Sequence, residues 1–183
     1  MSEIEGLLKA YERFVRLPWD PGLAGPQKVW FAIYDPVQER RLRLRLSDFE
    51  VATKRANHQW HLVDLTETFA TWMANHEYRE AYFEQPADMD LALEEYVDFV
   101  VSQLKLTFTS PELSNDSLVA LLGVSSLFGL ARVSTVVEKI VPDIRGRLLV
   151  FFPGQVEGNN YRLLDARDGW NYLAVPITSS EEK

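Results

Sequence analysis

The sequence predicts an α/β fold, a three-layer sandwich with a mostly parallel sheet of about five strands and helices on both faces. Short, continuously apolar runs recur along the chain, and such runs are typical of strands covered on both faces. Segments with helical spacing of apolar residues separate the runs, and this alternation indicates βαβ units. The 183 residues suffice for one domain with a sizeable core, so we expect a single α/β domain over residues 1–183.

The N-terminal part, residues 1–28, is expected to form a helix and a strap. Apolar residues recur there at intervals of three and four, as in an amphipathic helix: Ile4, Leu7, Leu8, Tyr11 and Val15. The following residues, 17–26, include several that do not continue a helix, namely Pro18, Pro21, Gly22 and Pro26. We therefore expect this Pro/Gly-rich piece to run as a loop or strap.

Apolar runs mark the expected strands, which are residues 29–34, 60–63, 118–122, 147–152 and a shorter run at 172–177. The first four are continuous and should be buried on both faces. Pro176 cannot donate a backbone hydrogen bond, so the last strand should lie at an edge of the sheet or end there. Residues 178–183 form a polar tail, and the order of the strands stays open.

Helices are expected between these runs, at about 38–56, 66–75, 89–104 and 130–141. Within the first of them, residues 41–46 alternate strictly between arginine and leucine, which is the pattern of a strand. The flanking residues favour a helix, so we predict a helix with a possible break at Ser47, a good N-cap residue.

Composition excludes several classes of chemistry. The chain has no cysteine, which excludes a disulfide framework, thiolate zinc sites and thiol catalysis. Residues 1–5 are acidic, unlike the start of a signal peptide, and the apolar stretch 118–131 is too short to span a bilayer. We therefore expect a cytoplasmic protein without a membrane partner.

Charge is divided unevenly along the chain, whose formal net charge is −8. Residues 38–57 hold six bases and three acids, whereas residues 67–116 hold two bases and eleven acids. Such asymmetry bears on partners rather than on the fold, although solvated helix faces would explain each segment taken alone. The negative total argues against direct nucleic-acid binding, although the arginine-rich segment could act locally.

Two aspartates follow expected strands and are candidate ligand-binding residues. Asp35 comes after the first strand and Asp64 ends the second, where α/β sheets bind ligands such as a metal or a ribose. The alternative is that Asp35 caps a turn at Asp35–Pro36 and Asp64 caps the helix near Thr66. No glycine-rich phosphate loop follows Tyr34 and no recognisable metal-ligand spacing exists, so we expect no cofactor and no metal.

Ser125 and Ser126 are the other candidate ligand-binding residues, because residues 123–129 lie between a strand and a helix. A nucleophile elbow would need glycine where Leu127 stands and a later histidine, so a serine hydrolase is disfavoured. The alternatives are that a serine caps the next helix or that the helix N-terminus binds an anion. The histidines precede these serines, and His58 and His61 should point to opposite faces of a strand, which makes them poor metal co-ligands.

Five residues are candidates for partner binding. Arg41 and Arg45 belong to the basic segment, and Tyr161, Arg162 and Trp170 follow the fourth expected strand. Tyrosine, tryptophan and arginine are enriched in interface hot spots. The alternative is ordinary turn chemistry, since the surrounding residues are rich in Gly, Asn and Asp.

Three blocks of sequence together resemble the BrxB family of bacteriophage-exclusion (BREX) defence systems. They are residues 17–50, with Leu17-Pro18-Trp19 and Glu39-Arg40-Arg41-Leu42; residues 120–129; and residues 146–172, with Phe152-Pro153-Gly154 and Asn160-Tyr161-Arg162. The resemblance implies a small cytosolic bacterial component encoded beside a DNA methyltransferase, a PglZ-type protein and a large ATPase. No catalytic residues are established for that family, so none are carried over.

The expected function is therefore a non-enzymatic adaptor of a BREX complex, which links the PglZ-type protein and the ATPase. The residues themselves agree with this expectation, because each catalytic template lacks a required member. The alternative is a degenerate nucleotide- or nucleic-acid-binding α/β domain that uses Asp35, Asp64 and the turn at 125–129.

Overall fold

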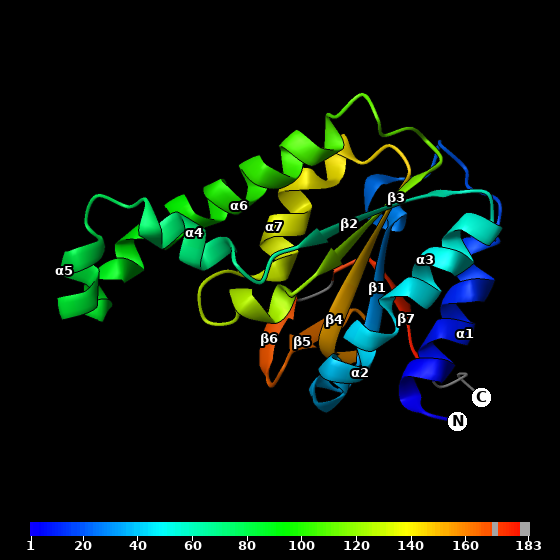
Figure 1. Ribbon diagram of the computed structural model, residues 1–183, viewed down its shortest axis with the longest axis horizontal. Helices are drawn as coiled ribbons and strands as arrows, with labels where there is room; N and C mark the ends of the chain where they lie inside the picture. The colour runs from blue at the N-terminus through cyan, green and yellow to red at the C-terminus, as the bar shows by residue number, and fades with distance from the viewer. Residues whose placement is uncertain (170–171, 180–183) are drawn as a thin grey trace.

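The computed structural model describes residues 1–169 and 172–179, and it confirms the predicted α/β fold with a mostly parallel sheet. Within these residues, parallel strands lie in the order β2-β3-β4-β1-β7 (Figure 1). Their bounds are β1 Val29–Tyr34, β2 Gln59–Asp64, β3 Ser117–Leu122, β4 Arg147–Glu157 and β7 Val175–Ile177. The predicted strands all lie in this sheet.

Helices cover both faces of the sheet, as predicted (Figure 1). One face is covered by α1 (Glu3–Val15), α2 (Glu39–Leu44) and α3 (Leu46–Arg55), and the other by α4 (Thr68–Ala74), α6 (Leu93–Phe108) and α7 (Val133–Ile140). Alternate residues of each central strand point into the two cores, so Phe31 belongs to the core that includes α6 and α7, and Trp30 belongs to the core that includes α1. Continuous apolar runs are required because both faces are covered.

The two edge strands differ from the central ones. β7 lies at the edge beside β1, as Pro176 predicts, because an edge strand tolerates a residue without a backbone N–H. β2 lies at the opposite edge, and the prediction that it is buried on both faces is wrong, since Leu62 is exposed and Trp60 is only partly buried. An edge strand has one neighbour, so less of its surface is covered.

β4 is longer than predicted and leaves the parallel sheet at its end. Its last residues pair antiparallel with β5 (Asn160–Leu163), which pairs in turn with β6 (Ala166–Gly169). The turn uses Gly158 at φ 58°, in the left-handed region that glycine tolerates best. This hairpin was not predicted, because its strands are short and hold few apolar residues.

The helices match the predicted positions with shifted ends. The break in the basic segment falls at Arg45, which separates α2 from α3, rather than at Ser47. The segment predicted to start a helix at 89 instead forms the 3-10 helix η3 (Pro86–Ala92), and α6 begins only at Leu93. A short helix, α5 (Arg79–Glu84), was not predicted. No described helix is both long and apolar enough to cross a membrane.

The strap is held by stacked rings at the amino-terminal end of the sheet. Trp19 lies flat on His58, with ring centroids 3.5 Å apart, and Trp30 meets Trp19 edge to face. The buried guanidinium of Arg147 lies 5.1 Å from the centre of the Trp19 ring. Burial lowers the pKa of His58, and nearby Arg147 acts in the same direction, while Asp116 opposes it.

Candidate functional site at the carboxyl edge of the sheet

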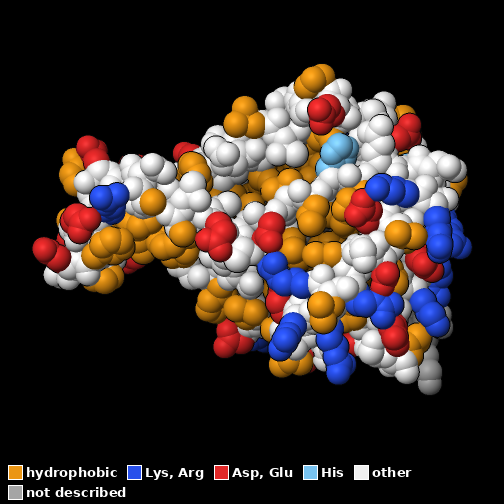
Figure 2. Space-filling view, in the orientation of Figure 1, with side chains coloured by type: hydrophobic (Ala, Val, Ile, Leu, Met, Phe, Trp, Pro, Cys, Tyr) orange, Lys and Arg blue, Asp and Glu red, His pale blue; other side chains and the backbone are white. Residues whose placement is uncertain are grey.

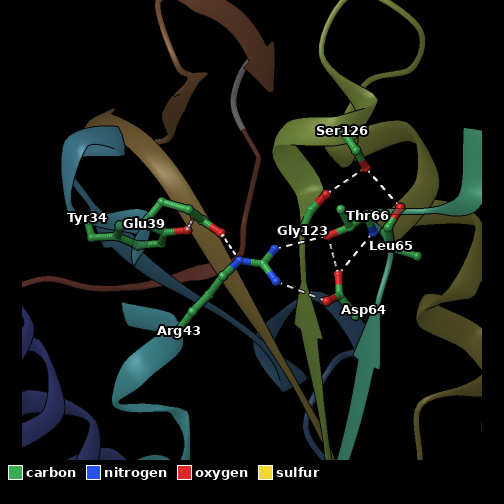
Figure 3. Close-up of polar contacts among 8 residues, drawn as sticks. All are labelled: Tyr34, Glu39, Arg43, Asp64, Leu65, Thr66, Gly123 and Ser126. Carbon is green, nitrogen blue, oxygen red and sulfur yellow. Dashed lines mark hydrogen bonds and ion pairs between the residues drawn. The ribbon is translucent and has the colours of Figure 1, made fainter. Parts of the chain in front are cut away.

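A polar cluster lies where β1, β2 and β3 end, at the edge at which α/β sheets bind ligands (Figure 3). Tyr34 ends β1, Asp64 ends β2, and Gly123 follows β3. Arg43 reaches this edge from α2 and lies at the centre of the cluster. The cluster therefore combines residues from the strand ends and from the helix that covers them.

Arg43 uses its guanidinium to hold the cluster together (Figure 3). Its Nε donates to Glu39 Oε1 at 2.8 Å, one terminal nitrogen donates to Asp64 Oδ2 at 3.1 Å, and the other donates to Thr66 Oγ1 at 3.0 Å. The Tyr34 hydroxyl donates to the second Glu39 oxygen. These bonds tie α2 to the end of β2 and leave each guanidinium nitrogen of Arg43 engaged.

The cluster favours charged forms of Asp64 and Arg43. Burial raises the pKa of Asp64, but hydrogen bonds from Thr66 and Arg43 outweigh it, and the pKa is lowered overall. Burial lowers the pKa of Arg43, yet Glu39 and Asp64 raise it overall. Burial, reinforced by the Glu39 carboxylate, raises the pKa of Tyr34, so its hydroxyl stays protonated. The cluster is a set of satisfied ion pairs rather than an activated acid or base.

Asp35 caps the turn at Asp35–Pro36, as the alternative interpretation predicts. The prediction that Asp64 caps the next helix is wrong, because α4 begins after Glu67 without a side-chain cap from any described residue, and Asp64 instead closes a turn with Thr66. Asp35 Oδ1 accepts from the Val37 N–H at 2.9 Å, and Asp64 Oδ1 accepts from the Thr66 N–H at 3.0 Å and the Thr66 hydroxyl at 2.5 Å. Because β3 and β4 lie between β1 and β2, the two aspartates are about 14 Å apart by strand spacing. The fold does not bring them together around one ligand.

The turn after β3 is built on Gly123, and the prediction that a serine caps the next helix is wrong. Ser126 donates its hydroxyl to the carbonyls of Leu65 and Gly123, at 2.9 and 2.7 Å, which joins the ends of β2 and β3. Ser125 forms no side-chain hydrogen bond with any described residue. Among those residues, α7 begins after Arg132 without a side-chain cap, because the 3-10 helix η4 (Val124–Leu127) and a loop separate it from the serines.

The candidate partner-binding residues are distributed between surface and core. Arg41 and Arg162 are exposed, and each bonds only locally, to Gln38 Oε1 and to the Asp165 carbonyl. Arg45 pairs with Asp48 and Glu5. Tyr161 is 1% exposed and donates to the Ala174 carbonyl, so its ring belongs to the core rather than to a surface. Trp170 lies outside the described residues.

Two hollows lie near this part of the molecule. One, of about 290 Å³, is lined by Tyr34, Glu3, Glu157 and the backbone of β4 around Gly154. The larger, of about 440 Å³, lies on the opposite face between α6, the start of α7 and the β5–β6 hairpin, and it is mostly apolar. In the described part of the chain, no group of three His, Cys, Asp or Glu side chains could hold a metal ion.

Three members of the site were not predicted from the sequence, namely Arg43, Glu39 and Thr66. A usable signal existed, since Arg43 follows the first strand and Asp64 ends the second, at the same edge of a parallel sheet. The alternation of arginine and leucine in residues 41–46 also fits a strand, and which arginines face this edge follows only once these residues are known to form a helix.

Comparison with known proteins adds no assignment. No family model, no curated protein and no solved structure matches this chain. The resemblance to the BrxB family therefore stays a prediction.

Proposed function

We propose that this chain is a non-enzymatic adaptor that links larger proteins, in the BREX assembly that its sequence blocks imply. The observation that carries the proposal is that the polar side chains at the carboxyl edge of the sheet form hydrogen bonds with one another. Arg43, Glu39, Asp64 and Thr66 satisfy one another there, and Ser126 is occupied by two carbonyl groups. A catalytic or nucleotide site would need such groups to be directed at a ligand.

The distribution of charge and apolar side chains over the surface also supports an adaptor. Basic side chains gather over α2 and α3, at the lower right of Figure 2, and acidic side chains lie on the segment that projects at the left. Opposite charges at separate places give a protein two distinct surfaces, and charge complementarity favours different partners at each. A chain of this size can therefore contact two larger proteins at once.

Co-purification tests the adaptor role. The tagged chain should retain the PglZ-type protein or the large ATPase of the same genome when all are expressed together, and retention should decrease with salt. Arg41→Glu and Arg162→Glu reverse exposed charges at predicted partner positions, while Arg16→Glu reverses an exposed charge at the end of α1 and is the matched control. Retention of neither protein at low salt would refute the adaptor role.

Ligand binding is the second candidate, favoured by the hollow of about 290 Å³ at the ends of β1 and β4. Nucleotides, divalent metals and short DNA can be screened by thermal shift. A ligand at a hundred times its dissociation constant should add about 2.7 kcal/mol to the free energy of unfolding. A panel without shifts would exclude these ligands and leave the adaptor role unaffected.

A further inference from the structure

A projecting arm carries apolar side chains that the fold does not cover. The arm comprises residues 77–92, which are α5, η3 and the turn before them, and it extends away from the sheet (Figure 1). Phe83 is 65% exposed and Leu91 is 92% exposed, and Tyr78 is exposed as well. Large apolar side chains gathered on one projection are typical of a protein-binding surface.

The arm is also strongly acidic. Its acids are Glu77, Glu80, Glu84, Asp88 and Asp90, and its one base, Arg79, is engaged by Glu80 and by the Ala74 carbonyl. Apart from Glu80, these carboxylates form no ion pair with any residue that the structure describes. A partner that covers the apolar side chains should therefore bring positive charge.

The apolar surface continues from the arm into the larger hollow. The arm runs directly into α6 at Leu93, and Leu93 and Val97 line the hollow of about 440 Å³ together with Phe128, Leu130 and Leu163. Figure 2 shows hydrophobic side chains along the lower side of the arm and on the adjoining body. The arm and the hollow beside it, whose charged lining residues are Glu94 and Arg132, are together called the groove below.

The chain itself presents a helix face with the complementary chemistry. Val37 and Leu44 are 79% and 75% exposed, and the exposed Arg40 and Arg41 lie between them. The spacing 37, 40, 41, 44 places the four side chains on one side of the segment formed by η2 (Pro36–Gln38) and α2. Arg40 has no partner among the described residues, and Arg41 contacts only Gln38.

We propose that the groove of one copy binds the Val37–Leu44 face of a second copy. Aliphatic side chains at the two ends of that face would cover the apolar arm, and the two arginines would meet the unpaired carboxylates. The arm projects from one end of the molecule, and α2 lies on the body away from it (Figure 1), so one copy cannot satisfy both surfaces itself. Self-association uses the same two charged surfaces as the proposed adaptor contacts, so partners would compete with it, but its test needs only this chain and its failure would leave the adaptor role standing.

Sedimentation velocity of the isolated chain tests the proposal. We expect a species heavier than the 21.1 kDa monomer at about 0.1 M salt, and dissociation at about 1 M salt, where the Debye length decreases from about 10 Å to about 3 Å. The arm variant Phe83→Asp/Leu91→Asp and the helix variant Arg40→Glu/Arg41→Glu should each raise the dissociation constant about tenfold or more. Because all four positions are exposed, both variants should keep the circular dichroism spectrum of the parent.

Mixing the two variants provides the sharpest control. Each retains the surface that the other has lost, so an equimolar mixture should recover one arm-to-helix contact and associate better than either variant alone. The variant Lys9→Glu/Arg16→Glu changes the net charge by as much as the helix variant, outside both surfaces, and should associate like the parent. A monomer at every concentration and salt level, association insensitive to both variants, or a mixture without recovery would overturn the proposal.

Discussion

Replacement of Gly123 by alanine tests how the ends of β2 and β3 are joined. Gly123 has φ 75°, and an added Cβ would lie 2.5 Å from Asp64 Oδ1, 2.5 Å from Thr66 Oγ1 and 2.9 Å from the Thr66 nitrogen. None of these separations is possible without movement, and one of the atoms belongs to the backbone. Gly123→Ala should therefore displace the turn that holds Asp64 and Thr66.

The expected cost has two parts. An alanine in the left-handed region costs about 1–2 kcal/mol. Displacement of the two hydrogen bonds between Thr66 and Asp64 costs about 1 kcal/mol each, giving about 3–4 kcal/mol in all. Since 1 kcal/mol lowers the melting temperature of a protein of this size by about 2–4 °C, Gly123→Ala should melt roughly 6–16 °C lower.

Gly129→Ala is the matched control. Gly129 has φ 76°, almost the same as Gly123, but an added Cβ would meet no atom within 4 Å. It should lose only the backbone contribution of about 1–2 kcal/mol, and the entropic effect of Gly→Ala on the unfolded chain is common to both variants. Urea unfolding followed by tryptophan fluorescence gives both values. Equal losses for the two variants would refute the close approach of Gly123 to Asp64 and Thr66.

Three further predictions concern buried and charged pairs. Thr53→Val removes the hydroxyl that bonds the buried Tyr11 hydroxyl at 2.5 Å, so it should cost about 1–3 kcal/mol, and adding Tyr11→Phe should recover part of the loss in urea titrations. Because burial lowers the pKa of His58, the unfolded chain binds the proton more readily, so the free energy of unfolding should decrease as the pH falls below the ordinary histidine value of about 6.5. Between about pH 7.5 and about pH 5.5, the His58→Gln variant should lose less of its free energy of unfolding than the parent. Arg43→Met should cost about 1 kcal/mol or less because the ion pairs are partly exposed, and carboxyl NMR should show the pKa of Asp64 rising toward its ordinary value. The lowered pKa of Asp64 stabilises the fold at neutral pH, and this contribution is lost on acidification. If Asp64 titrates in Arg43→Met as it does in the parent, Arg43 does not lower its pKa.

The central strands could be predicted because burial on both faces requires continuous apolar runs in their sequence. Residues 29–34 and 118–122 are apolar throughout, since two layers of helices cover them, and no other element would need such runs. The edge strand β2 and the hairpin β5–β6 were less predictable. Their residues face solvent on one side or pair only locally, so the apolar pattern that marks a strand is weak there.

The sequence predicts where in the fold the candidate site lies, but not which residues interact there. Asp35 and Asp64 were found because they end strands, and the edge of a parallel sheet follows from the topology alone. Their separation depends on β3 and β4 lying between them, which is a matter of strand order that local sequence does not encode. The role of Arg43 depends on which side of α2 faces β2, and that is set by tertiary packing.

The pairing of β1 has a consequence for synthesis on the ribosome. Val29 pairs with Leu148 on one side of β1, and Trp30 pairs with Val175 on the other. Most of the chain must therefore be synthesised before β1 can pair with either neighbouring strand. Such long-range closure is slow, and an exposed apolar strand is open to wrong pairing in the meantime. Nascent chains should therefore remain protease-sensitive until release, and dependence on a holding chaperone would be a property of the strand order itself.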